Sequence, residues 1–148
     1  MRALVQRVAR ASVRLPDGEI RRTGRGLLIY LGVGPQDGTA EAEKLAEKIT
    51  GLRIFPDSEG RFDLSAADVK AEILLISQFT LYADCRKGRR PDFSQAAPPQ
   101  AAKPLYELFR RVLEGKGFAL KTGEFGAHMD VEAETDGPVN LWLDTAGW

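Results

Sequence analysis

Two unbroken apolar runs place the strongest constraint on the fold of this chain. They are Gly26–Val33, which reads GLLIYLGV, and Ile73–Ile76, which reads ILLI. Apolar runs of this kind, closed by Gly, Pro or polar residues, are typical of strands buried on both faces of a sheet. We therefore expect a central sheet that other parts of the chain cover.

Two segments have the apolar spacing of amphipathic helices that can pack on such a sheet. The first begins at Thr39 and ends at Gly51, and its apolar face consists of Ala42, Leu45, Ala46 and Ile49. The second runs from near Pro99 to Glu114, and its apolar face consists of Leu105, Leu108, Phe109, Val112 and Leu113. Pro104 either kinks the second helix or marks its true start.

Most of the remaining chain has the composition of short strands. The tripeptide Pro16-Asp17-Gly18 is a tight-turn signal and predicts a hairpin near the N-terminus. The predicted outer strands are residues 1–9, 11–15, 52–55, 118–122, 129–133 and 139–143. We predict a single α+β domain over residues 1–148, with a curled, barrel-like β-sheet and two packed amphipathic helices.

Composition excludes several classes of protein. The 21 Lys or Arg residues balance the 21 Asp or Glu residues, so any contact with nucleic acid must come from a local patch. One cysteine, Cys85, and one histidine, His128, cannot form a disulfide framework or a Cys/His metal cluster, and we expect no metal and no cofactor. The chain begins with strand-like alternation and has no apolar stretch of membrane-spanning length, so we expect a cytoplasmic protein without membrane contacts.

Polar side chains follow the second apolar run directly. Ser77, Gln78 and Thr80 place two hydroxyls and a carboxamide at the end of a predicted core strand. Because an unpaired buried polar group costs about 1–3 kcal/mol, such a cluster indicates either a functional site or a turn whose backbone these groups satisfy. His128 could serve as a general base only if it lay near one of the two hydroxyls in space.

A basic run occupies the loop that follows. Arg86, Lys87, Arg89 and Arg90 are four cations within five residues. Such a run can hold phosphate groups, or it can remain solvated without a partner.

These features occur together in one known family. The segment Ser77–Pro91, the near-terminal Asp136-Gly137-Pro138-Val139 and further matches at residues 1–8, 52–55 and 125–127 resemble the D-aminoacyl-tRNA deacylases. The resemblance covers nearly the whole chain. It implies hydrolysis of the ester between a D-amino acid, or glycine mischarged on alanine tRNA, and the terminal adenosine of a tRNA. It also implies a homodimer whose active site lies at the subunit interface.

The resemblance further implies roles for single residues. The catalytic segment is Ser77, Gln78, Phe79 and Thr80, in which the amides of Phe79 and Thr80 stabilise an oxyanion while a ribose hydroxyl of the tRNA activates water. Ser77 and Gln78 orient the strand end and the ammonium group of the amino acid. Thr80 as a hydroxyl nucleophile is the less favoured alternative, because no base stands near it in sequence.

Other parts of the resemblance concern selectivity and RNA binding. A cis peptide between Gly137 and Pro138 of the partner subunit excludes L side chains with its backbone oxygens. Phe125 and Met129 match the pocket for the terminal adenine, although both also suit a core. The basic run from Arg86 to Arg90 becomes a contact with the tRNA backbone.

Two residues depart from the family pattern beside the selectivity motif. The usual motif reads Asn-x-Gly-Pro-Val-Thr, whereas this chain has Thr135 and Asn140 at the ends. β-Branched Thr disfavours left-handed turns, so the turn that carries Gly137 could differ in shape. Two alternative functions remain: removal of small L-amino acids from mischarged tRNA, as in relatives with a trans Gly-Pro bond, and tRNA binding without turnover.

Overall fold

The computed structural model describes residues 1–148 and has an α+β fold. Its helices are α1 (Thr39–Gly51) and α2 (Pro99–Gly115), and its short 3-10 turns are η1 (Phe79–Tyr82) and η2 (Thr145–Gly147). No helix is long and apolar enough to cross a membrane. The strands are β1 (Arg2–Arg14), β2 (Ile20–Thr23), β3 (Gly26–Gly32), β4 (Phe55–Pro56), β5 (Phe62–Leu64), β6 (Glu72–Ser77), β7 (Leu120–Thr122) and β8 (Asp130–Asp144).

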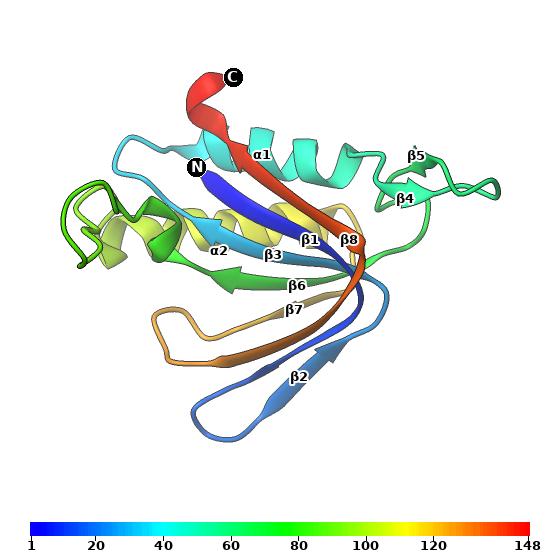
Figure 1. The fold of residues 1–148 in the computed structure, drawn as a ribbon, viewed down its shortest axis with the longest axis horizontal. Helices are drawn as coiled ribbons and strands as arrows, with labels where there is room; N and C mark the ends of the chain where they lie inside the picture. The colour runs from blue at the N-terminus through cyan, green and yellow to red at the C-terminus, as the bar shows by residue number, and fades with distance from the viewer.

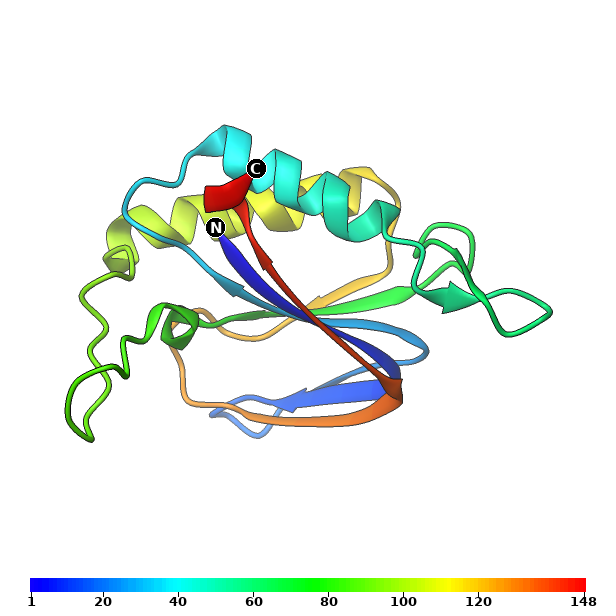
Figure 2. The ribbon, with the colours of Figure 1, turned by 45° about the horizontal axis from the view of Figure 1, so that its top comes forward.

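The main sheet has the strand order β2-β1-β3-β6-β7, and β8 pairs with β1. Strand β1 runs antiparallel to β2, β3 and β8, whereas β6 runs parallel to both β3 and β7. A parallel pair needs a crossover connection, and here α1 and α2 supply the two crossovers. Both helices lie on the same face of the sheet, as Figures 1 and 2 show.

The sheet has an apolar core on each side. On the helix side, Ile29 and Leu75 pack in one cluster with Leu45 of α1 and Phe109 of α2. On the other side, alternate residues of the same strands belong to a second cluster, which consists of Val8, Ala11, Val13, Leu15, Leu28, Leu74 and Ile76. The second half of β1 and the first half of β8, together with β2, curl back to cover this cluster (Figure 2). Both apolar runs are therefore buried on two faces, and the predicted fold class is confirmed.

Two pairs of predicted strands are each one long strand. Residues 1–9 and 11–15 fall within β1 apart from Met1 and Leu15, and residues 129–133 and 139–143 fall within β8 apart from Met129. The predictions were wrong because the two long strands stay paired through a bend, where their register shifts between Gln6 and Arg10. A bulge of this kind turns a sheet without ending its strands.

Two smaller predictions also need correction. Residues 52–54 are not in a strand, because the carbonyl of Ile54 accepts a hydrogen bond from the Arg7 side chain at 2.6 Å instead of a ladder partner. Strand β7 begins at Leu120 rather than at residue 118. The predicted start of the second helix near Pro99 is confirmed, because Pro99 takes the first helical position of α2, where no N–H donor is required. Pro104 lies inside α2 and therefore does not mark its start.

Gly26 lies opposite Glu72 at the start of the β3–β6 pair, and its replacement tests the packing of these two strands. A Cβ atom at Gly26 would lie 1.8 Å from the carbonyl oxygen of Glu72, whereas one at Gly51 would meet nothing within 4 Å. We expect Gly26→Ala to lower the free energy of unfolding by about 3 kcal/mol, because the backbone of a core ladder cannot move aside. The control Gly51→Ala should change it by less than about 1 kcal/mol. Urea unfolding monitored by circular dichroism measures both, and equal effects would contradict the close approach.

Candidate active site

The chain turns into η1 directly at the end of the buried strand β6. The amide of Gln78 donates to the carbonyl of Leu31 at 2.8 Å, which ties the start of the turn to β3. Leu81 N donates to Gln78 O at 3.3 Å, and Ala83 N donates to Thr80 O at 3.0 Å. A 3-10 turn leaves its first N–H groups without an internal acceptor, so the amides of Phe79 and Thr80 are free to bind a ligand.

The far end of η1 is held by Arg2. Its Nη1 donates to the carbonyl of Leu81 at 3.1 Å, and its Nε forms an ion pair with Asp144 at 2.9 Å. The guanidinium also lies 4.3 Å from the ring centre of Tyr82. Both ends of the turn are thus fixed to the main sheet.

The side chains of this segment lack a protein base. Gln78 Nε2 donates to Thr80 Oγ1, and no carboxylate or imidazole is hydrogen-bonded to the Thr80 hydroxyl. Activation of a hydroxyl nucleophile requires such a base at hydrogen-bond distance. The geometry therefore favours Thr80 as a backbone donor rather than as a nucleophile.

A cavity of about 630 Å³ opens beside the turn. Its size falls in the range of sites for nucleoside-sized ligands. The predicted residues that line it are Ser77, Gln78, Phe79, Phe125, His128 and Met129. Residues from the end of β6 and from the loop between β7 and β8, which are far apart in sequence, therefore meet in one place.

The wall of the cavity is largely apolar and is closed by Tyr106 of α2. The Tyr106 hydroxyl donates to the carbonyl of Leu75 at 3.2 Å, and its ring centre lies 5.6 Å from that of Phe125. Burial raises the pKa of Tyr106, so this hydroxyl remains a protonated donor near neutral pH. Phe125 is thus half-buried against a rigid aromatic support, with its remaining surface available to the cavity.

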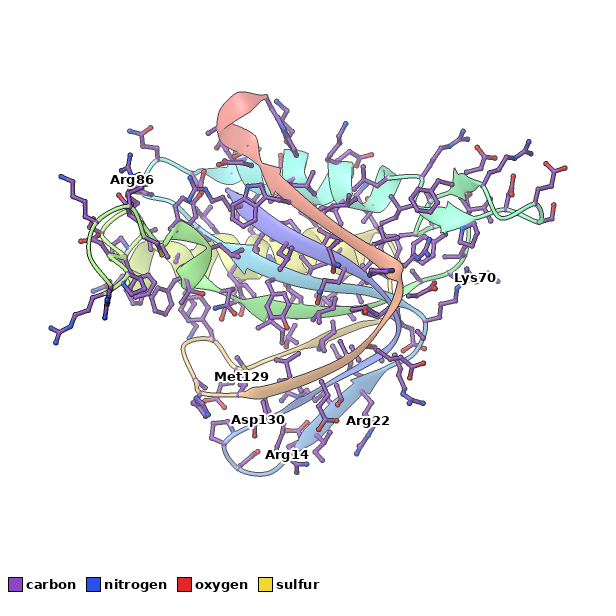
Figure 3. The ribbon with its side chains drawn as sticks, in the orientation of Figure 1. Arg14, Arg22, Lys70, Arg86, Met129 and Asp130 are labelled. Atoms are coloured by element: carbon purple, nitrogen blue, oxygen red, sulfur yellow. The ribbon has the colours of Figure 1, made fainter.

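The basic run lies on the loop between η1 and α2, which projects from one end of the molecule (Figures 1 and 3). Arg86 forms an ion pair with Asp84 at 2.5 Å, and hydrogen bonds from Arg86 lower the pKa of the Asp84 carboxyl to about 2. Lys87, Arg89 and Arg90 are exposed and form no ion pair within the chain. None of the four cations lines the cavity.

The predicted selectivity motif lies at a different place in the same chain. Gln6 pairs with Asn140 and Val8 pairs with Thr135, so β1 places only Arg7 opposite the bulge Asp136–Val139. This bend of β8 lies at the other end of the sheet from η1, near β4 and β5 (Figure 1).

The bulge contains the Gly137–Pro138 peptide bond, which is cis, as the resemblance implies. Gly137 has φ +123°, a conformation that only glycine adopts readily. Neither Gly137 nor Pro138 lines the cavity of its own chain.

Arg7 supports the bulge and was missed in the sequence analysis. It is only 5% exposed, and besides its bond to Ile54 its Nε donates to Asp136 O at 3.1 Å and pairs with the Asp136 carboxylate at 3.0 Å. A Cβ atom on Gly137 would lie 2.9 Å from Arg7 Nη2. One signal could have identified it: Ala3, Val5 and Arg7 alternate along the buried face of β1, where an arginine needs partners.

The two departures from the family pattern have simple structural outcomes. Thr135 pairs with Val8 and is not among the residues with positive φ, so the absence of Asn there does not disturb a left-handed turn. Asn140 Oδ1 accepts a hydrogen bond from Gln6 Nε2 at 2.7 Å across the two strands. The new carboxamide is therefore paired beside the bulge.

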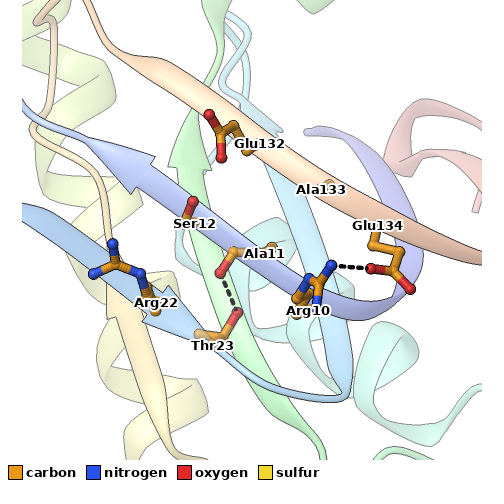
Figure 4. A pocket seen from close by; sticks show the side chains of 8 residues that line it. All are labelled: Arg10, Ala11, Ser12, Arg22, Thr23, Glu132, Ala133 and Glu134. Atoms are coloured by element: carbon orange, nitrogen blue, oxygen red, sulfur yellow. Dashed lines mark hydrogen bonds and ion pairs between the residues drawn. The ribbon is translucent and has the colours of Figure 1, made fainter.

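A second cavity, of about 360 Å³, lies between β1, β2 and β8 (Figure 4). Arg10 pairs with Glu134 at 2.7 Å there, and Thr23 Oγ1 donates to the carbonyl of Ala11 at 3.4 Å. No predicted site residue lines it, and its cationic and anionic side chains balance one another. The first cavity is therefore the candidate active site.

The support that Arg7 gives to the bulge can be tested by stability. We expect Arg7→Met to lower the free energy of unfolding by about 2–3 kcal/mol, because the Ile54 carbonyl loses its donor and Asp136 loses its partner. Arg10→Met on the same strand removes an exposed ion pair and should cost less than about 1 kcal/mol. Denaturant titration of both variants measures the difference, and a similar loss in each would contradict the role of Arg7.

The sequence from residue 4 to residue 144 matches the family described as D-Tyr-tRNA(Tyr) deacylase. A D-aminoacyl-tRNA deacylase of Thermotoga petrophila is 49% identical over 146 residues, which cover 99% of this chain and 98% of that protein. A D-aminoacyl-tRNA deacylase of Roseiflexus castenholzii is 56% identical over 146 residues, which cover 99% of this chain and 93% of that protein.

Two solved structures share the fold of this chain. The c-Myc DNA Unwinding Element Binding Protein has a TM-score of 0.89 and 40% identity, over 98% of this chain and 99% of its own. A probable eukaryotic D-amino acid tRNA deacylase has the same fold, with a TM-score of 0.82 at 18% identity over 96% of this chain and 97% of its own. The matched family model spans nearly all of β1 to β8, and the chain belongs to the D-Tyr-tRNA(Tyr) deacylase family.

Proposed function

We propose that this protein hydrolyses the ester bond of D-aminoacyl-tRNA and releases the free D-amino acid and the tRNA. Membership of the family supports the reaction, which is that of a carboxylic ester hydrolase acting on aminoacyl-tRNA. One observation carries the proposal: Phe79, whose amide is free, lines a cavity large enough for an aminoacylated adenosine, and the free amide of Thr80 follows it in the same turn, although Thr80 itself does not line the cavity.

These amides are suited to stabilise the transition state. When water attacks the ester carbonyl, the carbonyl oxygen gains negative charge and accepts hydrogen bonds from the two N–H donors. The donors are fixed by the buried strand β6 and by Arg2, so they need not reorganise during the reaction. Ser77 and Gln78 orient the strand end and the ammonium group of the bound amino acid.

The water is activated by the substrate rather than by the protein. No base is hydrogen-bonded to Thr80, and His128 is an exposed residue at the cavity wall. A ribose hydroxyl of the terminal nucleotide lies next to the ester by covalent structure, so it can take the part of the missing base. Phe125 and Met129 hold the adenine between a ring and a thioether.

Chiral selection comes from a second subunit. The bend of β8, which carries Gly137 and Pro138, lies at the other end of the sheet from η1, so a homodimer is needed to bring this motif to a cavity. Backbone oxygens of the motif then occupy the space into which an L side chain would project. Glycine has no side chain to exclude, so glycyl-tRNA is also accepted.

The reaction and its selectivity can be tested together with D-tyrosyl-tRNA and L-tyrosyl-tRNA. We expect the purified protein to release D-tyrosine and to leave L-tyrosyl-tRNA intact over the same time. Thr80→Ala should retain the D-specific rate within about tenfold, since its amide is preserved. Release of radiolabelled tyrosine measures all three rates. Hydrolysis of the L-ester at a comparable rate would contradict chiral selection, and no release from either ester would leave only the fold and a binding role.

The contact between the basic loop and the tRNA backbone can be tested by salt dependence. We expect the double variant Arg89→Gln/Arg90→Gln to reduce the slope of log affinity against log salt concentration by about 1 to 2. Arg86→Gln is the matched control, because its charge is already paired with Asp84, and it should change the slope less. Filter binding of tRNA at several salt concentrations gives the slopes, and an unchanged slope in the double variant would exclude the contact.

A further inference from the structure

Two exposed aromatic rings are in contact at the wall of the candidate active site. Phe79 is 57% exposed and Phe93 is 37% exposed, although large apolar side chains are usually buried. Their ring centres lie 5.1 Å apart in an edge-to-face arrangement, and both residues line the cavity. An edge-to-face pair leaves a ring face open to a further planar group.

The same loop carries the unpaired cations. The backbones of Asp84 and Asp92 exchange hydrogen bonds of 2.7 and 2.9 Å, which close the loop that contains the basic run. Phe93 follows this closure directly, so its ring is held beside the base of the loop. The free cations of the loop are Lys87, Arg89 and Arg90.

Aromatic rings beside a basic segment are the combination that binds single-stranded nucleic acid. Bases stack on the rings whatever their identity, and the cations hold the phosphates. If the two rings were only part of the core, they would be buried and no cations would be expected beside them. If the basic run were only a solvated surface, no exposed rings would be expected beside it. Here the two rings line a cavity of nucleoside size, and the cations lie on the loop that ends beside Phe93.

We propose that Phe79 and Phe93 form a stacking platform for the nucleotide that precedes the terminal adenosine of the substrate RNA. This inference rests on the proposed function, in which the terminal adenosine fills the cavity. The preceding nucleotide must leave the cavity past its rim, where the two rings are exposed. The platform therefore adds a second nucleotide subsite and leads the strand toward the basic loop.

The test compares D-tyrosyl esters of two fragments, adenosine alone and the trinucleotide CCA. The readout is the ratio of kcat/KM for the CCA ester to kcat/KM for the adenosine ester. We expect a ratio well above one for the wild-type protein and a ratio about tenfold lower for Phe93→Leu, which keeps an apolar side chain but loses the aromatic face. Phe93→Trp should restore the ratio.

Trp148→Leu is the matched control, because Trp148 is also a large exposed aromatic residue, 44% exposed, and does not line the cavity. This variant should keep the wild-type ratio. A wild-type ratio near one, an unchanged ratio in Phe93→Leu, or an equal fall in Trp148→Leu would overturn the platform. If the wild-type protein hydrolyses neither ester, the proposed function fails. In that case the ratio of binding affinities for uncharged CCA and adenosine tests the platform with the same variants. A ratio that falls in Phe93→Leu and not in Trp148→Leu would support the platform, and an unchanged ratio in Phe93→Leu would overturn it.

Discussion

The parallel pairing of β3 and β6 is the constraint on which the rest of the structure depends. Leu28 and Leu74 bury one face of this pair and Ile29 and Leu75 bury the other, so neither strand can shift without opening a core. The parallel direction requires crossover helices, which places α1 and α2 on one face and leaves the other to the curled ends of β1 and β8. Because β6 cannot move, the turn that follows it presents its free amides at a fixed point beside the cavity.

The proposed site uses the two ends of the sheet in different ways. One end supplies the cavity, the free amides and the exposed rings, and the other supplies the bulge that Arg7 supports. Each end is incomplete for a chirally selective reaction. In a two-fold dimer every contact between the chains occurs twice, once in each direction. A dimer that brings the bulge of one chain to the cavity of its partner would therefore complete both sites. Chiral selectivity would then depend on assembly as well as on folding.

Much of the fold could be predicted because the two apolar runs admit few arrangements, and the helices follow from their apolar spacing. The long strands could not be predicted, since their continuity depends on a bulge whose backbone groups are satisfied by Arg7, a residue far away in sequence. The position of Ser77 at the end of a strand could be predicted from the sequence. The presence of Tyr106 in the same cavity could not, because Tyr106 comes from α2 and meets the end of β6 only in the folded chain. It also treated Arg86 as a free cation, whereas a turn of the loop pairs it with Asp84.

The central claim is that one active site is built from two chains, and subunit mixing tests it most directly. One variant, Ala96→Trp, fills the cavity, so its homodimer should have lost hydrolysis of both D-tyrosyl-tRNA and L-tyrosyl-tRNA. Another variant, Gly137→Val, disrupts the bulge, so its homodimer should hydrolyse the L-ester as well as the D-ester. A mixed dimer would contain one site with an intact cavity and an intact bulge, and its other site would have a filled cavity. We expect the mixed dimer to hydrolyse D-tyrosyl-tRNA at up to about half of the wild-type rate and to leave L-tyrosyl-tRNA intact. Mixed dimers that hydrolyse the L-ester as the Gly137→Val homodimer does, or that hydrolyse neither ester, would contradict a site shared between subunits.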